Sequence, residues 1–274
     1  MSARVAILLL STLLAATSAV AAERQELHLT TATRVLNELM QMPEQNVPTW
    51  LLERAHAVAV IPGVIKVSLA IGGRRGKGLL VIRKSNGAWS NPVFINLTGG
   101  SFGFQAGVQS TDVVLVFTSR QSIEGIVGGK VTLGADASVA AGPVGRQSSA
   151  ATDIGLTAQV YSYSRASGLF AGVALDGSAL TIDHKSNEAF YGRPGVLASE
   201  IIADTAPAAP APAQDFIAAI QRSATGTTAT RTVEQTSPSP AASAPASAEG
   251  RPADPGALTT YPMEDPRPGQ EPPE

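Results

Sequence analysis

The chain has 274 residues, with 20 lysines and arginines, 22 aspartates and glutamates, 3 histidines and no cysteine. Its formal net charge of -2 argues against a nucleic-acid-binding protein, because such proteins usually have a strongly basic domain. Without cysteine there are no disulfides, no thiolate nucleophile and no cysteine-ligated zinc. Because the net charge is slightly negative, any basic surface must be confined to part of the chain.

Residues 1–22 have the features of a secretory signal peptide. Arg4 supplies positive charge, residues 5–16 are apolar, and small residues at 18–22 precede the expected cleavage site before Glu23. The alternative is a membrane anchor, but the apolar run is short for a span of about 20 residues. We expect a periplasmic or secreted protein, peripherally associated with membrane. It should not be a lipoprotein, because no cysteine follows the signal.

An amphipathic helix is expected next. Apolar residues recur mostly at spacings of three and four between Leu27 and Met40, and the pattern ends near Pro43. A second short helix is expected over residues 50–55, after Pro48. The polar face of the first helix is not rich in lysine or arginine, so its apolar face is expected to pack on a sheet rather than lie on a membrane.

Short strands between glycine-rich turns are expected over residues 57–118. Pairs such as Pro62-Gly63 and Gly72-Gly73 are typical of turns, and Asn86-Gly87 is typical of a two-residue hairpin. The expected strands cover residues 57–61, 64–71, 77–84, 93–97, 102–108 and 113–118.

The second half of the chain repeats the strand pattern. A short helix is expected over residues 119–127, with Gly128-Gly129 at its end, and a last helix over residues 215–222. Residues 223–274 are rich in proline and alanine and contain scarcely any large apolar residue, which predicts a disordered tail. The further expected strands cover residues 130–133, 135–140, 154–163, 169–175 and 179–183, with a short helix at 188–191.

These elements predict one α+β domain over residues 23–222. The sheet is expected to be mainly antiparallel and could close towards a barrel, with helices at both its N- and C-terminal ends.

One pattern suggests an enzyme. Residues 99–103 match G-x-S-x-G, with Ser101 as the nucleophile and His184 later in the chain, the order of an α/β-hydrolase. That motif needs a strand before the serine and a helix after it, whereas residues 102–108 are expected to form another strand. A serine hydrolase at Ser101 is therefore the least favoured alternative.

No metal or cofactor site is expected. The histidines at 28, 56 and 184 are isolated, and none has a partner at a ligand spacing of three or four. The phosphate-loop pattern is also missing around Gly76-Lys77 and Gly129-Lys130.

A local group of basic residues remains. Such a surface can bind anionic lipid headgroups, each charge near the membrane contributing on the order of 1 kcal/mol. The alternative is a solvated strand edge that the charges protect from pairing. The candidate residues are Lys66, Arg74, Arg75, Lys77, Arg83 and Lys84.

Several motifs, taken in order, resemble the SYLF domain family over roughly residues 25–222. The resemblance implies phospholipid binding and assigns it to the N-terminal helix and to Lys66, Arg74, Arg75 and Lys77. The motifs include Ala59-Val60-Ile61-Pro62, Gly76-Lys77-Gly78, Trp89-Ser90-Asn91-Pro92, Gly100-Ser101-Phe102-Gly103, Tyr161-Ser162-Tyr163-Ser164 and Leu175-Asp176-Gly177.

The leading hypothesis is a non-catalytic domain that docks to anionic phospholipid headgroups in the bacterial cell envelope. The alternative is an envelope scaffold that uses residues 223–274 to reach protein partners. The two hypotheses differ in the part of the chain that makes the contact.

Overall fold

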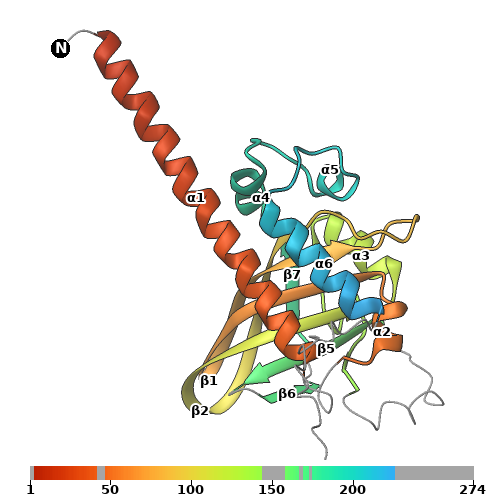
Figure 1. Cartoon of the computed structure of the whole chain (residues 1–274). Coiled ribbons are helices and arrows are strands. Elements are labelled where there is room, and N and C mark those ends of the chain that lie inside the picture. Colours follow the sequence, from red (N-terminus) through yellow and green to blue (C-terminus); the bar gives the residue numbers. More distant parts are fainter. Residues whose placement is uncertain (1–2, 42–46, 144–157, 167–168, 173–174, 226–274) are drawn as a thin grey trace, which may run out of the picture. The chain divides into compact units, whose positions relative to one another are not determined.

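The computed structural model describes residues 3–41, 47–143, 158–166, 169–172 and 175–225 (Figure 1). Side chains are described for all of these except residues 3–21, 69–71, 101–106, 166 and 169–172. All of them belong to one structural unit, Met1–Ala229. The helices are α1 (Ala3–Met40), α2 (Thr49–Glu53), α3 (Arg120–Val127), α4 (His184–Tyr191), α5 (Ala198–Ile202) and α6 (Ala211–Thr225). The strands are β1 (Ala57–Ile82), β2 (Val93–Phe117), β3 (Lys130–Thr132), β4 (Val139–Ala141), β5 (Val160–Ala166), β6 (Leu169–Gly172) and β7 (Ser178–Ile182).

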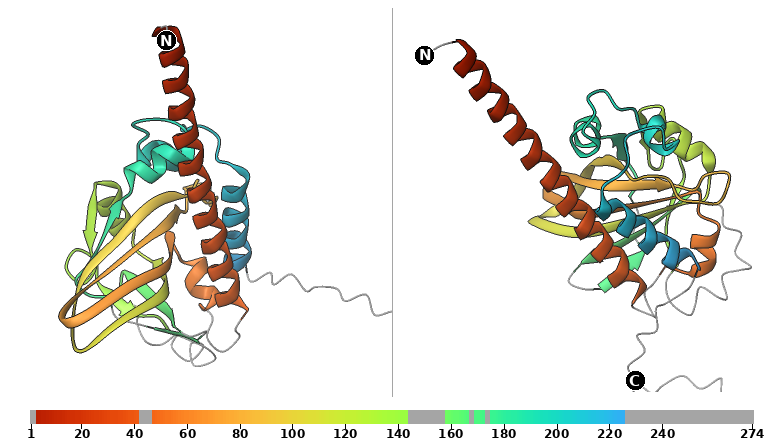
Figure 2. Two further views of the ribbon diagram at one scale, coloured as in Figure 1. Left: turned by 90° about the vertical axis from the view of Figure 1, so that its left-hand side faces the viewer. Right: turned by 45° about the horizontal axis from the view of Figure 1, so that its top comes forward.

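The sheet is mainly antiparallel, which confirms the expected fold class. Its strands follow the order β3-β7-β2-β5-β4, with β1 paired to β2 and β6 paired to β5. The β4–β5 pair is parallel. The first half of β2 pairs with β7 and the second half with β5, so β2 joins two parts of the sheet. The sheet curls strongly around its interior (Figures 1 and 2), and in the described strands no pairing closes β3 onto β4.

Strands β1 and β2 form one long hairpin. Asn86-Gly87 makes the expected turn: Gly87 has a φ of 83°, and its N–H donates to the Lys84 carbonyl at 2.9 Å. The division into six short strands was wrong, because β1 runs through Pro62-Gly63 without ending. The register shifts between Ile61 and Val64, so these residues form a bulge inside an edge strand, where the missing N–H of proline is tolerated.

The middle of this hairpin projects as a two-stranded ribbon. Residues 64–73 of β1 pair with residues 100–111 of β2, and among the described strands this part of β2 has no other neighbour. We call these two segments the ribbon arm. Its bend lies away from the helices (Figures 1 and 2).

Beyond the arm, β1 returns over its own first half. A Cβ atom on Gly78 would lie 2.5 Å from the Val60 carbonyl oxygen, and one on Gly76 would lie 2.8 Å from a methyl of Val64. Both distances are shorter than van der Waals contact. The two glycines therefore allow an approach that a larger residue would prevent.

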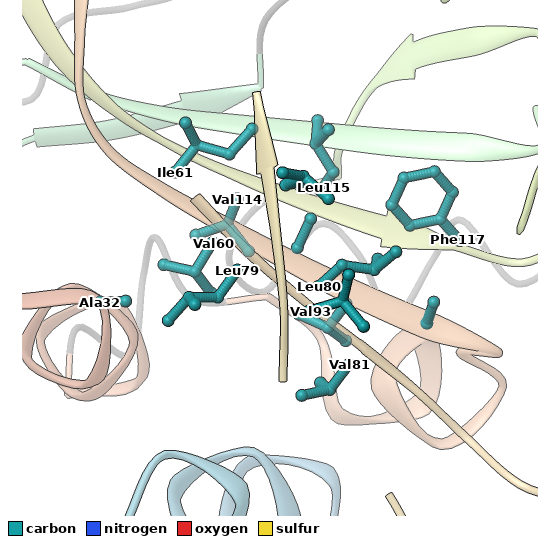
Figure 3. Packing of buried hydrophobic residues seen from close by; sticks show 14 of the residues in the cluster. Ala32, Val60, Ile61, Leu79, Leu80, Val81, Val93, Val114, Leu115 and Phe117 are labelled. Carbon is teal, nitrogen blue, oxygen red and sulfur yellow. The ribbon is translucent and has the colours of Figure 1, made fainter. Parts of the chain in front are cut away.

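Helices α1 and α6 lie side by side and contact each other on one side of the sheet (Figures 1 and 2). The packing of the α1 apolar face is confirmed by five buried residues, and Figure 3 shows Ala32 facing Val60 and Leu79 of β1. Leu27 was wrongly placed in that face, since its side chain is 63% exposed. The buried residues are Leu29, Ala32, Val35, Leu36 and Leu39.

Helix α1 begins at Ala3, so the segment expected as a signal peptide continues into the packed helix. Cleavage before Glu23 stays a prediction. None of the described helices combines the length and the apolar character needed to cross a bilayer.

The smaller elements follow the expectations with three corrections. Helix α6 runs from Ala211 to Thr225, so it begins inside the expected proline- and alanine-rich linker and extends past the expected domain end at residue 222. Helix α4 starts at His184 rather than at residue 188, because the Asp183 carboxylate accepts a hydrogen bond from the Ser186 N–H at 3.2 Å and caps the helix. Strand β4 begins at Val139, because residues 132–137 form a turn. Residues 144–157 and 226–274, which include part of an expected strand and most of the expected tail, lie outside the described residues.

Candidate functional site

The basic residues lie in a part of the sequence that contains no acid. Residues 54–111 contain 7 lysines and arginines and no aspartate or glutamate, whereas the whole chain carries a net charge of -2. This segment includes all of β1, the hairpin turn and most of β2. Sequence reasoning found the cations but missed the absence of acids, which a count of charge along the chain would have shown.

Arg83 is used inside the fold. Its Nε donates to the Ala55 carbonyl at 3.0 Å and its Nη2 to the Leu52 carbonyl at 2.9 Å. The guanidinium lies 4.5 Å from the ring centroid of Trp89. Burial lowers the pKa of Arg83, although the charge of Glu53 opposes this effect. Arg83 therefore ties the end of α2 to the sheet.

Lys77 and Lys84 are also engaged within the molecule. The Lys77 Nζ lies 2.6 Å from an Asp183 carboxylate oxygen and 3.2 Å from the Ser186 hydroxyl. Lys84 forms an ion pair with Asp204. Each lysine thus has a carboxylate from the C-terminal half close to its ammonium, which reduces its attraction for an external anion.

The remaining three cations lie on the ribbon arm or at its base. Lys66 is half-buried and Arg75 is exposed, and neither side chain has a hydrogen-bond or ion-pair partner among the described residues. Arg74 is half-buried, its Nε has no partner, and burial lowers its pKa while the charge of Asp176 raises it. These three residues, which we call the arm cations, are the predicted site residues most open to an external ligand.

The six predicted residues do not form one continuous patch. Arg83 lies eight residues beyond Arg75 on an extended strand, a separation of about 26 Å at the usual rise. Lys84 follows Arg83 into the hairpin turn. The structure therefore divides the predicted site into the arm cations and a group that holds other elements in place.

Ser101 lies in the middle of β2 and pairs with Gly72 of β1. The strand continues to Phe117, so the helix that a nucleophile elbow requires does not follow the serine. The Ser101 side chain lies outside the described residues. His184 is exposed at the start of α4. The hydrolase motif is therefore a chance match in a glycine-rich strand.

A polar pocket of about 350 Å³ lies between α1 and α6. Its charged lining residues are Arg34, Glu38 and Asp215, so carboxylates outnumber cations. Glu38 is also ion-paired with Arg165 of β5. With Glu38 paired to Arg165, the charges of Arg34 and Asp215 balance, so the pocket offers an anionic headgroup no net attraction. In the part of the chain that the structure describes, no group of three or more histidine, aspartate or glutamate side chains could hold a metal ion.

The buried Asp183 makes a testable contribution to stability. Burial raises its pKa, but hydrogen bonds from Lys77 and Ser186 and the charge of Lys77 outweigh burial and lower the pKa below 3.8. A lowered folded-state pKa stabilises the protein above about pH 4, and this contribution is lost as the pH falls further. Asp183→Asn is expected to cost about 2 kcal/mol at pH 7 and less towards pH 2, as measured by urea unfolding.

The control for Asp183 is Asp176→Asn, because Asp176 is exposed. It should change the free energy of unfolding by less than about 0.5 kcal/mol at either pH. An Asp183→Asn loss that stayed the same from pH 7 to pH 2 would contradict the ionised pair with Lys77.

The geometry defines an α+β domain whose candidate site is an exposed basic ribbon. Residues 98–223 match the family model Ysc84, described as a Las17-binding protein actin regulator. This match and the relatives below confirm the resemblance, and the chain belongs to the SYLF domain family.

Three similar proteins come from yeast, frog and human. The chain is 38% identical to protein YSC84 of Saccharomyces cerevisiae over 152 residues, which cover 54% of this chain and 32% of the relative. It is 33% identical to the SH3 domain-containing YSC84-like protein 1 of Xenopus laevis over 177 residues, covering 62% and 52%. For the human protein of that name the identity is 32% over 191 residues, covering 68% and 55%. The chain thus spans 32% to 55% of the lengths of these relatives.

Proposed function

We propose that this domain binds anionic phospholipid headgroups without catalysing a reaction. The observation that supports the proposal is the acid-free segment, residues 54–111. It contains both strands of the projecting arm, and among the described residues no carboxylate forms an ion pair with the arm cations. A basic surface of this kind attracts a layer of phosphate groups.

Lys66 and Arg75 are the residues we assign to headgroup contact, with Arg74 beside them. Lys77, Arg83 and Lys84 support the site by positioning the strands, because their charged groups already have intramolecular partners. Three of the six candidate residues, the arm cations, are thus assigned to headgroup contact.

Co-sedimentation with vesicles tests this assignment. The protein is expected to bind vesicles of phosphatidylglycerol and phosphatidylcholine more strongly than vesicles of phosphatidylcholine alone. The double substitution Lys66→Glu with Arg75→Glu removes about 2 kcal/mol of attraction and adds repulsion, so binding should weaken at least about tenfold at low salt.

The matched control reverses two exposed lysines elsewhere, Lys130 on β3 and Lys185 on α4. Lys130→Glu with Lys185→Glu changes the net charge by the same amount and should retain most of the binding. Equal binding to the two kinds of vesicle, or equal losses in the two double variants, would overturn the proposal.

We further propose that the protein acts in the periplasm or outside the cell. The charged n-region, apolar run and small residues before Glu23 support export. N-terminal sequencing of protein recovered from the periplasmic fraction tests this proposal. A protein that kept residues 1–22 and stayed in the cytoplasm would contradict it.

A second candidate is a protein-binding scaffold, because the family model is described as a Las17-binding protein and a Saccharomyces cerevisiae relative is named LAS seventeen-binding protein 3. In this chain the proline- and alanine-rich segment, residues 223–274, would contact the protein partner. Pull-down from an envelope extract with the full chain and with a chain ending at residue 225 separates the two candidates. A partner lost with the tail would support the scaffold, and unchanged vesicle binding would show that the lipid site is separate.

A further inference from the structure

Three exposed apolar side chains lie together on one face of the ribbon arm. Val108 is 75% exposed, Ile65 is 50% exposed and Val67 is 37% exposed. Val67 pairs directly with Val108 across the strands, and Ile65 lies two residues before Val67, which places all three on one face. Among the side chains that the structure describes, the other large exposed apolar residues are Leu27 and Leu197, on α1 and before α5.

The position of this apolar face is unusual for a protein in water. The arm is only two strands wide, and its bend lies away from the helices (Figure 1). In the described structure no other strand pairs with residues 100–111, and the three apolar side chains keep 37% to 75% of their surface exposed. An exposed apolar patch on a projecting element is typical of an interaction surface.

We propose that the ribbon arm inserts Ile65, Val67 and Val108 into the interfacial layer of an anionic bilayer. The inference rests on the proposed function and adds to it the element that enters the membrane. The arm cations alone would give weak attachment, because stable peripheral binding usually combines charge with an apolar anchor.

The charge around the apolar face favours a bilayer as the occupant. Lys66 lies between Ile65 and Val67, and Arg75 lies at the base of the arm. The side chain of Lys66 points to the opposite face, but its methylene stem can lie along a narrow ribbon and place the ammonium at phosphate level. No aspartate or glutamate within residues 54–111 would repel the headgroups.

A second copy of the chain is less suitable as the occupant. Pairing two arms face to face would bring together two ribbons that carry positive charge and, within residues 54–111, no aspartate or glutamate. Like charges that are brought together without carboxylates disfavour association.

Tryptophan fluorescence tests insertion directly. In Val108→Trp the new indole is expected to shift its emission to shorter wavelength and to lose accessibility to acrylamide when phosphatidylglycerol vesicles are added. The control is Leu197→Trp, at another exposed apolar position that is 54% accessible. Its emission should not change, and the background from Trp50 and Trp89 is subtracted with the unsubstituted protein.

A second variant tests the energetic contribution of the apolar face. Ile65→Ser with Val108→Ser should weaken vesicle binding at least tenfold at 0.5 M salt, where screening reduces the contribution of the cations. Leu197→Ser should have no such effect. Circular dichroism and urea unfolding would show that the variants remain folded, as expected for exposed positions.

The outcomes separate this inference from the proposed function. If the protein binds anionic vesicles but the Val108→Trp emission does not change, headgroup binding stands and insertion is overturned. If the protein binds no vesicle, both are overturned. If sedimentation velocity shows a dimer that Val108→Ser dissociates, the face binds a second copy and insertion is overturned.

Discussion

Replacing Gly78 with alanine is expected to lower the free energy of unfolding by about 3 kcal/mol. The new Cβ would lie 2.5 Å from the Val60 carbonyl oxygen and 2.6 Å from a side-chain carbon of Ile61. The first contact is with backbone, so it cannot be relieved by a side-chain rotation. Strand β1 would have to separate from its own first half, and the curled sheet would open at this point.

The control is Gly100→Ala, because a Cβ there meets no atom within 4 Å. It lies at the base of the ribbon arm, in the same hairpin, and its substitution should change stability by less than about 0.5 kcal/mol. Urea unfolding at pH 7 measures both variants. Equal stability of Gly78→Ala and the unsubstituted protein would contradict the close approach of the two halves of β1.

Replacing Arg83 with methionine is expected to cost about 3 kcal/mol of stability. The substitution removes two charged hydrogen bonds to the Leu52 and Ala55 carbonyls and the contact with the Trp89 ring. Methionine retains much of the apolar contact but cannot donate. The carbonyls at the end of α2 would then lose partners that water replaces only in part.

The matched variant is Arg75→Met, which removes the same charge from an exposed side chain. It should leave urea unfolding almost unchanged and weaken binding to phosphatidylglycerol vesicles. Arg83→Met, measured below its unfolding transition, should keep most of its vesicle binding. The reverse pattern would show that Arg83, not Arg75, contacts the headgroups.

The local parts of the fold could be predicted from the sequence. The Asn86-Gly87 turn, the buried face of α1 and the helix before Gly128-Gly129 depend on neighbouring residues, and all three were found in the structure. The continuity of β1 could not be predicted in this way. Pro62-Gly63 is typical of a turn, and only pairing with β2 along the whole strand turns it into a bulge.

The site could be predicted only in part for the same reason. The sequence shows every cation of the basic group, but their partners come from distant parts of the chain. Asp183 lies 106 residues from Lys77, and Asp204 lies 120 residues from Lys84. Which cations stay available for a ligand is therefore a property of the tertiary structure. The exposed face of Ile65 and Val108 likewise depends on how the long hairpin bends.

Hydrogen exchange of the protein on vesicles is the most direct measurement of the central claim. With phosphatidylglycerol vesicles, slower amide exchange is expected in peptides that cover residues 64–75 and 107–111, and no change is expected with phosphatidylcholine alone. Protection confined to α1, α6 or the C-terminal segment, with these peptides unchanged, would contradict a lipid-binding ribbon arm.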